Sequence, residues 1–205
     1  MIKKLQALKA KKGFTLVELV VVIAIIGVLA AILVPTMLGV VQDSRISSAD
    51  QSAAQIRNNT TSFLTKLNSK SITMIDESDF TLTVTIGTDG KWSVSGGTAD
   101  DWLDGVNHWG TDSTTDTDKE SYYTAYMKDM LSDVKNSVAQ VHFSNGKCLG
   151  VSIVSGATTL PTTLDMPALA DFKGTTTSAF DEKEGVSGST IVGTAPKLGK
   201  GTATT

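Results

Sequence analysis

The stretch KKGFTLVELVVVIAIIGVLAAILVP, residues 11–35, decides how the chain is organised. It opens an apolar run from Phe14 to Val41, 28 residues in which Glu18 is the only ionisable side chain. As a helix with a rise of about 1.5 Å per residue, the run would extend roughly 42 Å, more than the roughly 30 Å hydrocarbon thickness of a bilayer. The run therefore predicts a helix long enough to cross a membrane, with one carboxylate near its start.

The segment before the apolar run is strongly basic. Residues 1–13 contain no acidic side chain and five lysines: Lys3, Lys4, Lys9, Lys11 and Lys12. Without these five charges, the formal net charge would change from −3 to −8. Lysines that flank a membrane span stay on the cytoplasmic side, so they predict an inside N-terminus. The acidic remainder argues against a specific nucleic-acid partner, because phosphate binding needs concentrated Lys and Arg.

A basic segment followed by an apolar run has three ordinary explanations: a cleaved secretory signal, a permanent membrane anchor, or a special export signal. The run is much longer than the roughly 7–15 apolar residues of a secretory signal. An anchor fits the length, but it explains neither Glu18 nor Gly13, which directly precedes the run.

The order KKG, then FTLVE, then an apolar helix resembles the prepilin signal of type IV pilins and related pseudopilins. Basic leader, glycine, aromatic, glutamate and apolar run all follow in register. The resemblance implies that a prepilin peptidase cuts between Gly13 and Phe14 and methylates Phe14, with Lys11 and Lys12 as leader charges. It also implies that the precursor waits in membrane lipid. An assembly platform in the inner or cytoplasmic membrane would then join it to identical subunits in a helical filament.

Glu18 is the residue whose charge needs a physical reason. Cleavage after Gly13 would create an ammonium group at Phe14, roughly 6 Å from Glu18 along the helix axis. An unpaired carboxylate costs about 2.5–3.5 kcal/mol at mid-membrane, and less near the interface. An ammonium partner at about 4 Å offsets this by roughly 4 kcal/mol at an effective dielectric constant of about 20.

The resemblance implies that Glu18 of one subunit pairs with Phe14 of a neighbour, so that a wrongly seated subunit would bury an unpaired charge. Two alternatives stay open for Glu18. The carboxylate could lie at the headgroup boundary, or it could pair within its own chain.

Gly27 and Pro35 lie inside the apolar run. In water they weaken a helix by about 1 and 3 kcal/mol respectively, and Pro35 also removes a backbone donor. Membrane helices tolerate both residues. Similarity to pilins implies that the helix loosens between them when a subunit enters the filament; an ordinary membrane kink is the alternative.

After Val41 the sequence changes to an amphipathic helical pattern. Apolar or small residues recur at spacings of three and four: Ile46, Ala49, Ala53, Ile56, Thr60, Phe63 and Leu67. This stripe predicts one helix from about Phe14 to Leu67, with a sheet covering one side of its second half. The two alanines would allow close approach. A coiled-coil seam is the alternative, although it would need more apolar residues at these sites.

Two β-hairpins are predicted after residue 69. The first joins FTLTVTI, residues 80–86, to KWSV, residues 91–94, through the turn sequence TDG. The second has an Asn145–Gly146 turn, and its alternation predicts one buried face with Val141, Phe143, Leu149, Val151 and Ile153. Between the hairpins, residues 117–134 predict a short helix with a buried stripe of Tyr122, Tyr126, Met130 and Val134.

The whole pattern predicts an α+β fold, in which a long N-terminal helix packs on a small antiparallel sheet, as in pilins. We expect a basic leader at 1–13, a transmembrane and polymerisation half-helix at 14–41, and an amphipathic half-helix at 42–68. A globular antiparallel-sheet head would follow at 69–173, and a Thr-, Gly- and Ser-rich segment at 174–205. We expect this last segment to lie extended on the head surface, with its final ten residues loose.

A cluster of carboxylates is the only hint of a metal site. Asp112, Asp116 and Asp118 share one polar loop, and calcium prefers such oxygen ligands, but the loop lacks the EF-hand register. The resemblance keeps calcium in view, because pseudopilin heads use it. A solvated loop is the alternative.

The histidines and the cysteine do not form a zinc set. His108 and His142 are isolated from one another, and Cys148 is the single thiol. We expect His142 to face solvent from the polar side of its strand, and Cys148 to be a small apolar filler. Nucleophile elbows, Walker loops and dinucleotide fingerprints are missing from the sequence, so we expect no enzymatic activity and no cofactor.

The resulting expectation is a structural subunit of a type IV pilus, which serves adhesion, motility or surface interaction. It would be a single-pass precursor in the cytoplasmic membrane and then part of an extracellular pilus on a bacterial surface. Two alternatives remain. One is a pseudopilin of a type II secretion or DNA-uptake system, and the other is a membrane-tethered extracellular binding protein whose head works without polymer.

Overall fold

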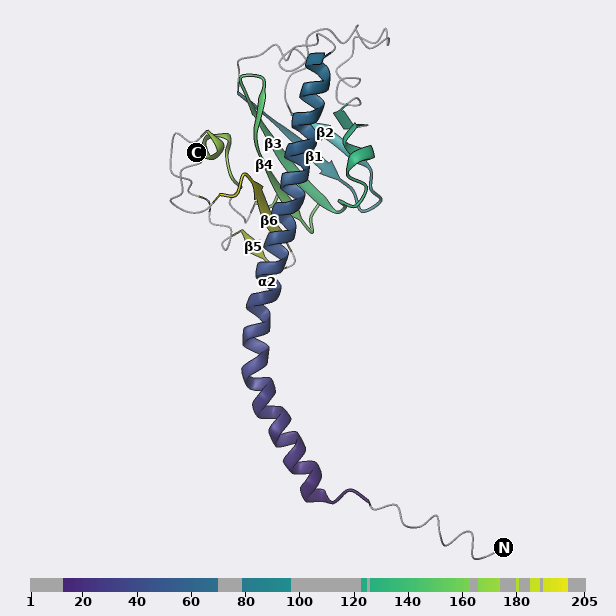
Figure 1. Ribbon diagram of the computed structural model, residues 1–205, viewed down its shortest axis with the longest axis vertical. Helices are drawn as coiled ribbons and strands as arrows, with labels where there is room; N and C mark the ends of the chain where they lie inside the picture. Colours follow the sequence, from purple (N-terminus) through teal and green to yellow (C-terminus); the bar gives the residue numbers. More distant parts are fainter. Residues whose placement is uncertain are drawn as a thin grey trace, which may run out of the picture. The chain divides into compact units, whose positions relative to one another are not determined.

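The computed structural model describes residues 13–69, 79–96, 123–124, 126–162, 166–173, 180, 185–188 and 190–198. The chain divides into two compact units between Asp43 and Ser44. Its elements, in chain order, are helix α2, strands β1 to β4, the short helix α5 (Leu169–Phe172), and strands β5 and β6 (Figure 1).

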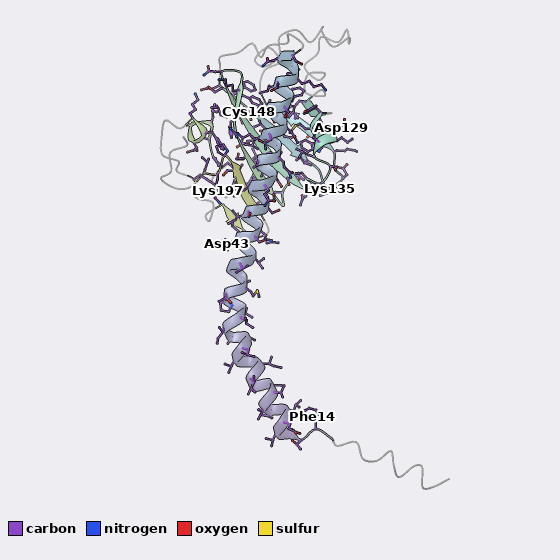
Figure 2. All side chains as sticks on the ribbon, in the orientation of Figure 1. Phe14, Asp43, Asp129, Lys135, Cys148 and Lys197 are labelled. Carbon is purple, nitrogen blue, oxygen red and sulfur yellow. The ribbon has the colours of Figure 1, made fainter. Side chains whose placement is uncertain are left out.

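Helix α2 runs from Leu16 to Ser69 without interruption, which confirms the predicted long helix. In the first unit its large apolar side chains are exposed all along the run that starts at Phe14 (Figure 2). In the second unit one face is buried, and it contains the seven predicted positions together with Leu64: Ile46, Ala49, Ala53, Ile56, Thr60, Phe63, Leu64 and Leu67. The spacing rule of three and four therefore located the helix face that covers the sheet.

The sheet of the second unit is antiparallel and has the strand order β2-β1-β3-β4-β6-β5. The strands are Phe80–Ile86 (β1), Trp92–Ser95 (β2), Ser137–Ser144 (β3), Lys147–Ser155 (β4), Val186–Ser187 (β5) and Thr190–Ala195 (β6). Both predicted hairpins are confirmed, as β1 with β2 and β3 with β4. At the second turn Asn145 and Gly146 have φ values of 51° and 69°, as a two-residue hairpin turn requires.

The sheet is buried on both faces rather than on one. The larger apolar cluster lies between the sheet and α2 and includes Phe63 of the helix and Leu82 and Ile153 of the strands. A second cluster covers the opposite face and joins the strand residues Val138, Val154 and Val192 to Phe172, Phe180 and Leu198. Strands β3 and β4 are therefore buried at nearly every position, and side chains expected to face solvent lie inside.

A β-bulge changes the face on which Leu149 lies. The pairing of β3 with β4 shifts between His142 and Phe143, so one residue of β4 is unpaired. Leu149 consequently packs against the second cluster, whereas Cys148 belongs to the first. The prediction that Leu149 shares the buried face of β3 and β4 with its alternating neighbours is wrong. Arg57 of α2 donates from Nε to the Leu149 carbonyl at 3.3 Å, which satisfies the backbone at the bulge.

The C-terminal segment supplies two strands of the sheet. Strand β6 pairs with β4 on one side and β5 on the other, and Ile191, Val192 and Ala195 are buried. The prediction that this segment lies on the head surface is wrong for its described part, because threonine-rich sequence forms strands as readily as loops. Leu198, just after β6, is 1% exposed; residues 199–205 lie outside the described residues.

The short helix before β3 is rotated from its predicted orientation. Residues 123–124 and 126–130 are helical, and the buried side chains are Tyr123, Met127, Leu131 and Val134. Only Val134 was in the predicted stripe. The Tyr123 hydroxyl forms a buried hydrogen bond of 2.7 Å with Thr60 of α2, and this bond fixes which side faces the core. Met130, predicted to be inside, is exposed.

His142 is buried, so the prediction that it faces solvent is wrong. Only 2% of the residue is exposed. Phe172 of α5 covers it, because the Phe172 ring stacks on the imidazole with centroids 5.0 Å apart. The Thr81 hydroxyl lies 2.9 Å from Nδ1. Burial lowers the pKa of His142 to about 4. His108 lies outside the described residues.

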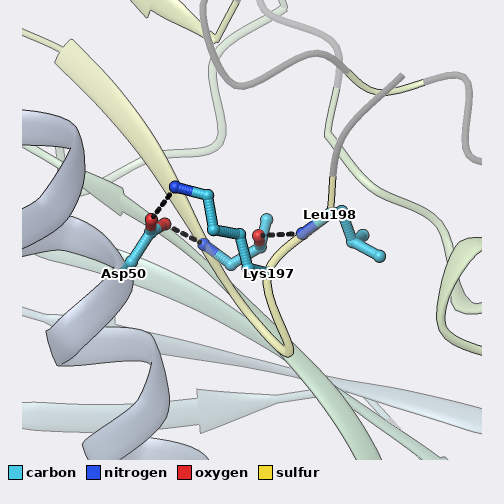
Figure 3. Close-up of polar contacts among 4 residues, drawn as sticks. Asp50, Lys197 and Leu198 are labelled. Carbon is cyan, nitrogen blue, oxygen red and sulfur yellow. Dashed lines mark hydrogen bonds and ion pairs between the residues drawn. The ribbon is translucent and has the colours of Figure 1, made fainter. Parts of the chain in front are cut away.

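Strand β6 approaches α2 closely at Gly193. A Cβ atom there would lie 2.6 Å from the Ala49 Cβ and 2.5 Å from the Asp50 nitrogen. The contact is held by Asp50, whose carboxylate accepts the Thr194 N–H at 2.9 Å and lies 3.4 Å from the Lys197 ammonium (Figure 3). The predicted close approach of a sheet to the alanines of α2 is confirmed.

Protonation of His142 should destabilise the fold. The imidazole has a pKa of about 4 when folded, against 6.5 for the unperturbed group. Between these values the unfolded chain binds more protons, so the free energy of unfolding rises with pH. The contribution of the neutral His142 to the free energy of unfolding is fully present above about pH 6.5. Up to about 3 kcal/mol of it is lost as the pH falls toward 4. Urea unfolding of the detergent-solubilised chain should show this slope, and a His142→Gln variant should show a shallower one.

Replacing Gly193 by alanine should lower the free energy of unfolding by about 1–3 kcal/mol, because helix and strand must separate to admit the methyl group. Urea unfolding followed by tryptophan fluorescence measures this. Gly39→Ala is the matched control, since a Cβ there meets nothing within 4 Å. Equal stability of the two variants would contradict the close packing.

Candidate functional site

The start of α2 is built around Thr15 and Glu18. The Thr15 hydroxyl accepts a hydrogen bond from the Glu18 N–H at 3.3 Å. In return, the Thr15 N–H and hydroxyl donate to Glu18 Oε2 at 2.9 and 2.7 Å. This reciprocal arrangement is a capping box, and the spacing Thr-x-x-Glu could have revealed it from the sequence. The predicted site did not include Thr15, because it was defined by the charge of Glu18 alone.

The capping box satisfies only part of the Glu18 carboxylate. Both donors bind Oε2, and within the described part of the chain Oε1 accepts no hydrogen bond. The carboxylate also lies in the first helical turn, where it interacts favourably with the helix dipole. Glu18 is thus bonded to its own chain in this structure, and one oxygen remains for a further donor. The pair with Phe14 of a neighbouring subunit stays a prediction.

The segment after the capping box presents an apolar surface. Phe14 is 80% exposed, and large side chains remain exposed through Val41. Helix α2 is long and apolar enough to cross a membrane, and none of its most apolar part is buried inside the protein. An uncovered apolar surface of this size requires lipid or other protein around it.

Gly27 and Pro35 sit within this part of α2, and the helix continues through both. A Cβ at Gly27 would meet nothing within 4 Å. Pro35 has no N–H, so the helix lacks one hydrogen bond there. One residue later, the Thr36 hydroxyl donates to the Leu33 carbonyl at 2.9 Å. The predicted loosening between Gly27 and Pro35 on assembly stays a prediction.

Other candidate sites receive little support. Within the described ranges no three His, Cys, Asp or Glu side chains are grouped so as to hold a metal ion. The calcium candidates Asp112, Asp116 and Asp118, like the leader lysines Lys11 and Lys12, lie outside the described residues. Cys148 is a buried free thiol, as expected of an apolar filler, and burial raises its pKa to about 12.

A family model for the prokaryotic N-terminal methylation motif matches residues 8–34, which include Gly13, Phe14 and Glu18. Together with the long apolar helix and the α+β fold, this match defines a type IV pilin-like or pseudopilin protein with a prepilin signal. The signal and the apolar helix indicate a membrane-anchored precursor.

The remainder of the chain matches a second family model, described as a domain of unknown function (DUF5021), over residues 46–199. The chain belongs to this family. The match begins at Ile46, the first buried residue of α2, so the family model describes the unit formed by the second half of the helix and the sheet. No solved structure matches the chain.

Removing the Thr15 hydroxyl should loosen the start of α2. Thr15→Val eliminates both the acceptor for the Glu18 N–H and one donor to its carboxylate, and loss of a cap costs about 1 kcal/mol. Amide exchange at Glu18, measured in detergent micelles, should become about fivefold faster. Thr15→Ser keeps the hydroxyl and should exchange at the wild-type rate; faster exchange in this variant too would contradict the capping role.

Proposed function

We propose that this protein is a structural subunit of a filament of the type IV pilus kind. The proposal rests on two features that occur together: a prepilin signal, and a helix surface that is apolar and exposed from Phe14 to Val41. A membrane anchor needs the apolar surface but not the signal. A filament subunit needs both, because its helix must leave the lipid after processing.

Two changes follow from cleavage between Gly13 and Phe14. The five lysines of the leader, which hold the N-terminus on the cytoplasmic side, are removed. An ammonium group is created next to the capping box, where Glu18 offers its second oxygen. Before cleavage Glu18 is an isolated acid in lipid, and after cleavage it belongs to a pair of opposite charges that can be buried.

In the filament, the apolar half-helices of neighbouring subunits replace lipid around one another. Repetition of one head-to-tail contact gives an open helical polymer. The ion pair between Glu18 of one subunit and Phe14 of the next would select the correct axial register, because a shifted subunit leaves both charges buried and unpaired. The prepilin peptidase and a membrane assembly platform are the partners that this route requires.

Mass analysis of the mature chain tests the processing step. The expected N-terminus is Phe14 carrying one methyl group, in material sheared from the cell surface and pelleted as fibres. A chain that retains its leader would contradict the proposal. A processed chain found only in the membrane would favour the tethered binding protein, and one confined to a short periplasmic or envelope structure would favour the pseudopilin.

Glu18→Gln should abolish most assembly while leaving cleavage and membrane insertion intact. Glutamine keeps the size and can still accept from Thr15, but it loses the attraction to the ammonium, worth roughly 4 kcal/mol. The yield of sheared filaments should fall at least about tenfold, as measured by immunoblot against total subunit. Asp43→Asn, the same chemical change at the first acid beyond the apolar run, should assemble normally. Equal yields from both variants would refute the register role.

A further inference from the structure

The outward face of α2 carries no charge between residues 47 and 65; the exposed side chains of Arg45 and Lys66 lie just beyond these bounds. Opposite the buried stripe, its exposed side chains between residues 47 and 65 are Ser47, Ser48, Gln51, Gln55, Asn58, Thr61, Ser62 and Thr65. At about 100° per residue they occupy one sector of roughly 140° on the helix. We call these eight residues the polar stripe. A helix face that stays in solvent ordinarily carries charged side chains, and depletion of charge is typical of interface centres.

The charged residues of this part of α2 are directed to the head rather than to the polar stripe. Asp50 binds the Thr194 N–H and lies near the Lys197 ammonium. Arg57 donates to the Leu149 carbonyl at the β-bulge. This part of α2 therefore does contain charged residues, but they lie on the side of the helix that contacts the sheet. The polar stripe is left without charge.

Several hydroxyl groups of the polar stripe already have partners inside the helix. Thr61 donates to the Arg57 carbonyl at 2.9 Å, Ser62 to that of Asn58 at 3.0 Å, and Thr65 to that of Thr61 at 2.9 Å. A hydroxyl whose donor is satisfied locally can leave water at low cost. Small hydroxyl residues also let another backbone approach closely. These residues are suited to burial even though they are exposed in the structure.

An exposed methionine lies beside the polar stripe. Outside the apolar run, Met130 is the one large apolar side chain in the described part of the chain that is strongly exposed, at 55%. It lines a hollow together with Gln55, Asn58 and Asn59 of α2 and with Leu131, Ser132, Asp133 and Val134, so Asp133 is the one charged residue of the lining. Methionine is enriched and charged residues are depleted at protein interfaces. The hollow thus joins an apolar anchor to amide groups that can both donate and accept.

We propose that the polar stripe and Met130 form the surface through which one copy of this chain contacts the next. The partner is a second copy because a polymer brings identical surfaces together, and uncharged amides and hydroxyls cause no repulsion between like charges when the same contact repeats. A contact through this surface would add to the one between apolar half-helices. The inference rests on the proposed function and locates where the heads meet.

A charge placed on the polar stripe tests this contact. Gln55→Lys should leave processing, methylation and membrane level unchanged, but lower the yield of sheared filaments about tenfold or more, since each repeat would bury an unpaired ammonium. Gln55→Ala introduces no charge and should stay within about threefold of the wild type. Met130→Glu should behave like Gln55→Lys. Thr159→Lys, at an exposed site after β4, is the matched control. Normal filaments from Gln55→Lys and Met130→Glu would overturn the proposal.

Photo-crosslinking identifies the partner directly. A benzoylphenylalanine introduced in place of Gln55 in the full chain should yield a dimer of this protein, mapped by mass analysis, while the same group in place of Thr159 should yield none. Crosslinking to a different protein, or no self-crosslink at Gln55, would overturn the inference. If the wild type forms no filaments, the proposed function fails, and the same crosslink in membranes still decides whether this surface meets a second copy.

Discussion

One helix must serve two environments, and this constraint governs the rest of the chain. Residues 16–43 of α2 are exposed, whereas residues 46–67 bury a stripe on a sheet. Backbone hydrogen bonds within a helix need no outside partner, so α2 can pass from lipid or protein to an aqueous head without leaving polar groups unsatisfied. Only the side chains differ between the two parts of the helix.

The head depends on how closely α2 approaches the sheet. Ala49 and Ala53 on the helix and Gly193 on β6 remove the side-chain volume that would separate them, and Asp50 then reaches the Thr194 N–H on an open part of the β6 edge. Each large side chain buried beside this contact contributes about 1.5–3 kcal/mol. The same acid blocks that edge from pairing with a foreign strand, which is a recurrent hazard of sheets.

Local sequence patterns predicted the helices and strands, but not which residues pack against them. The helix stripe, both hairpins and the prepilin signal depend on spacing within a short stretch, and each was predictable from the sequence. His142 is buried by Phe172, Leu149 is displaced by a β-bulge, and β6 pairs with the distant strand β4. No local period encodes any of these three features. Thr15 is a different case, because the spacing Thr-x-x-Glu is a local pattern that is sufficient to predict the capping box.

The placement of charge then connects fold with assembly. Along α2, three charged side chains are engaged within the chain: Glu18 by Thr15, Asp50 by β6, and Arg57 by the β-bulge. The other three, Asp43, Arg45 and Lys66, are exposed and lie outside the polar stripe. Two surfaces of α2 are therefore poor in charge: the apolar run, in which Glu18 is the only ionisable side chain, and the polar stripe, which has none. A monomeric protein gains nothing from keeping such surfaces uncovered. A subunit that repeats in a filament does, because any uncompensated charge on a contact would be multiplied at every repeat.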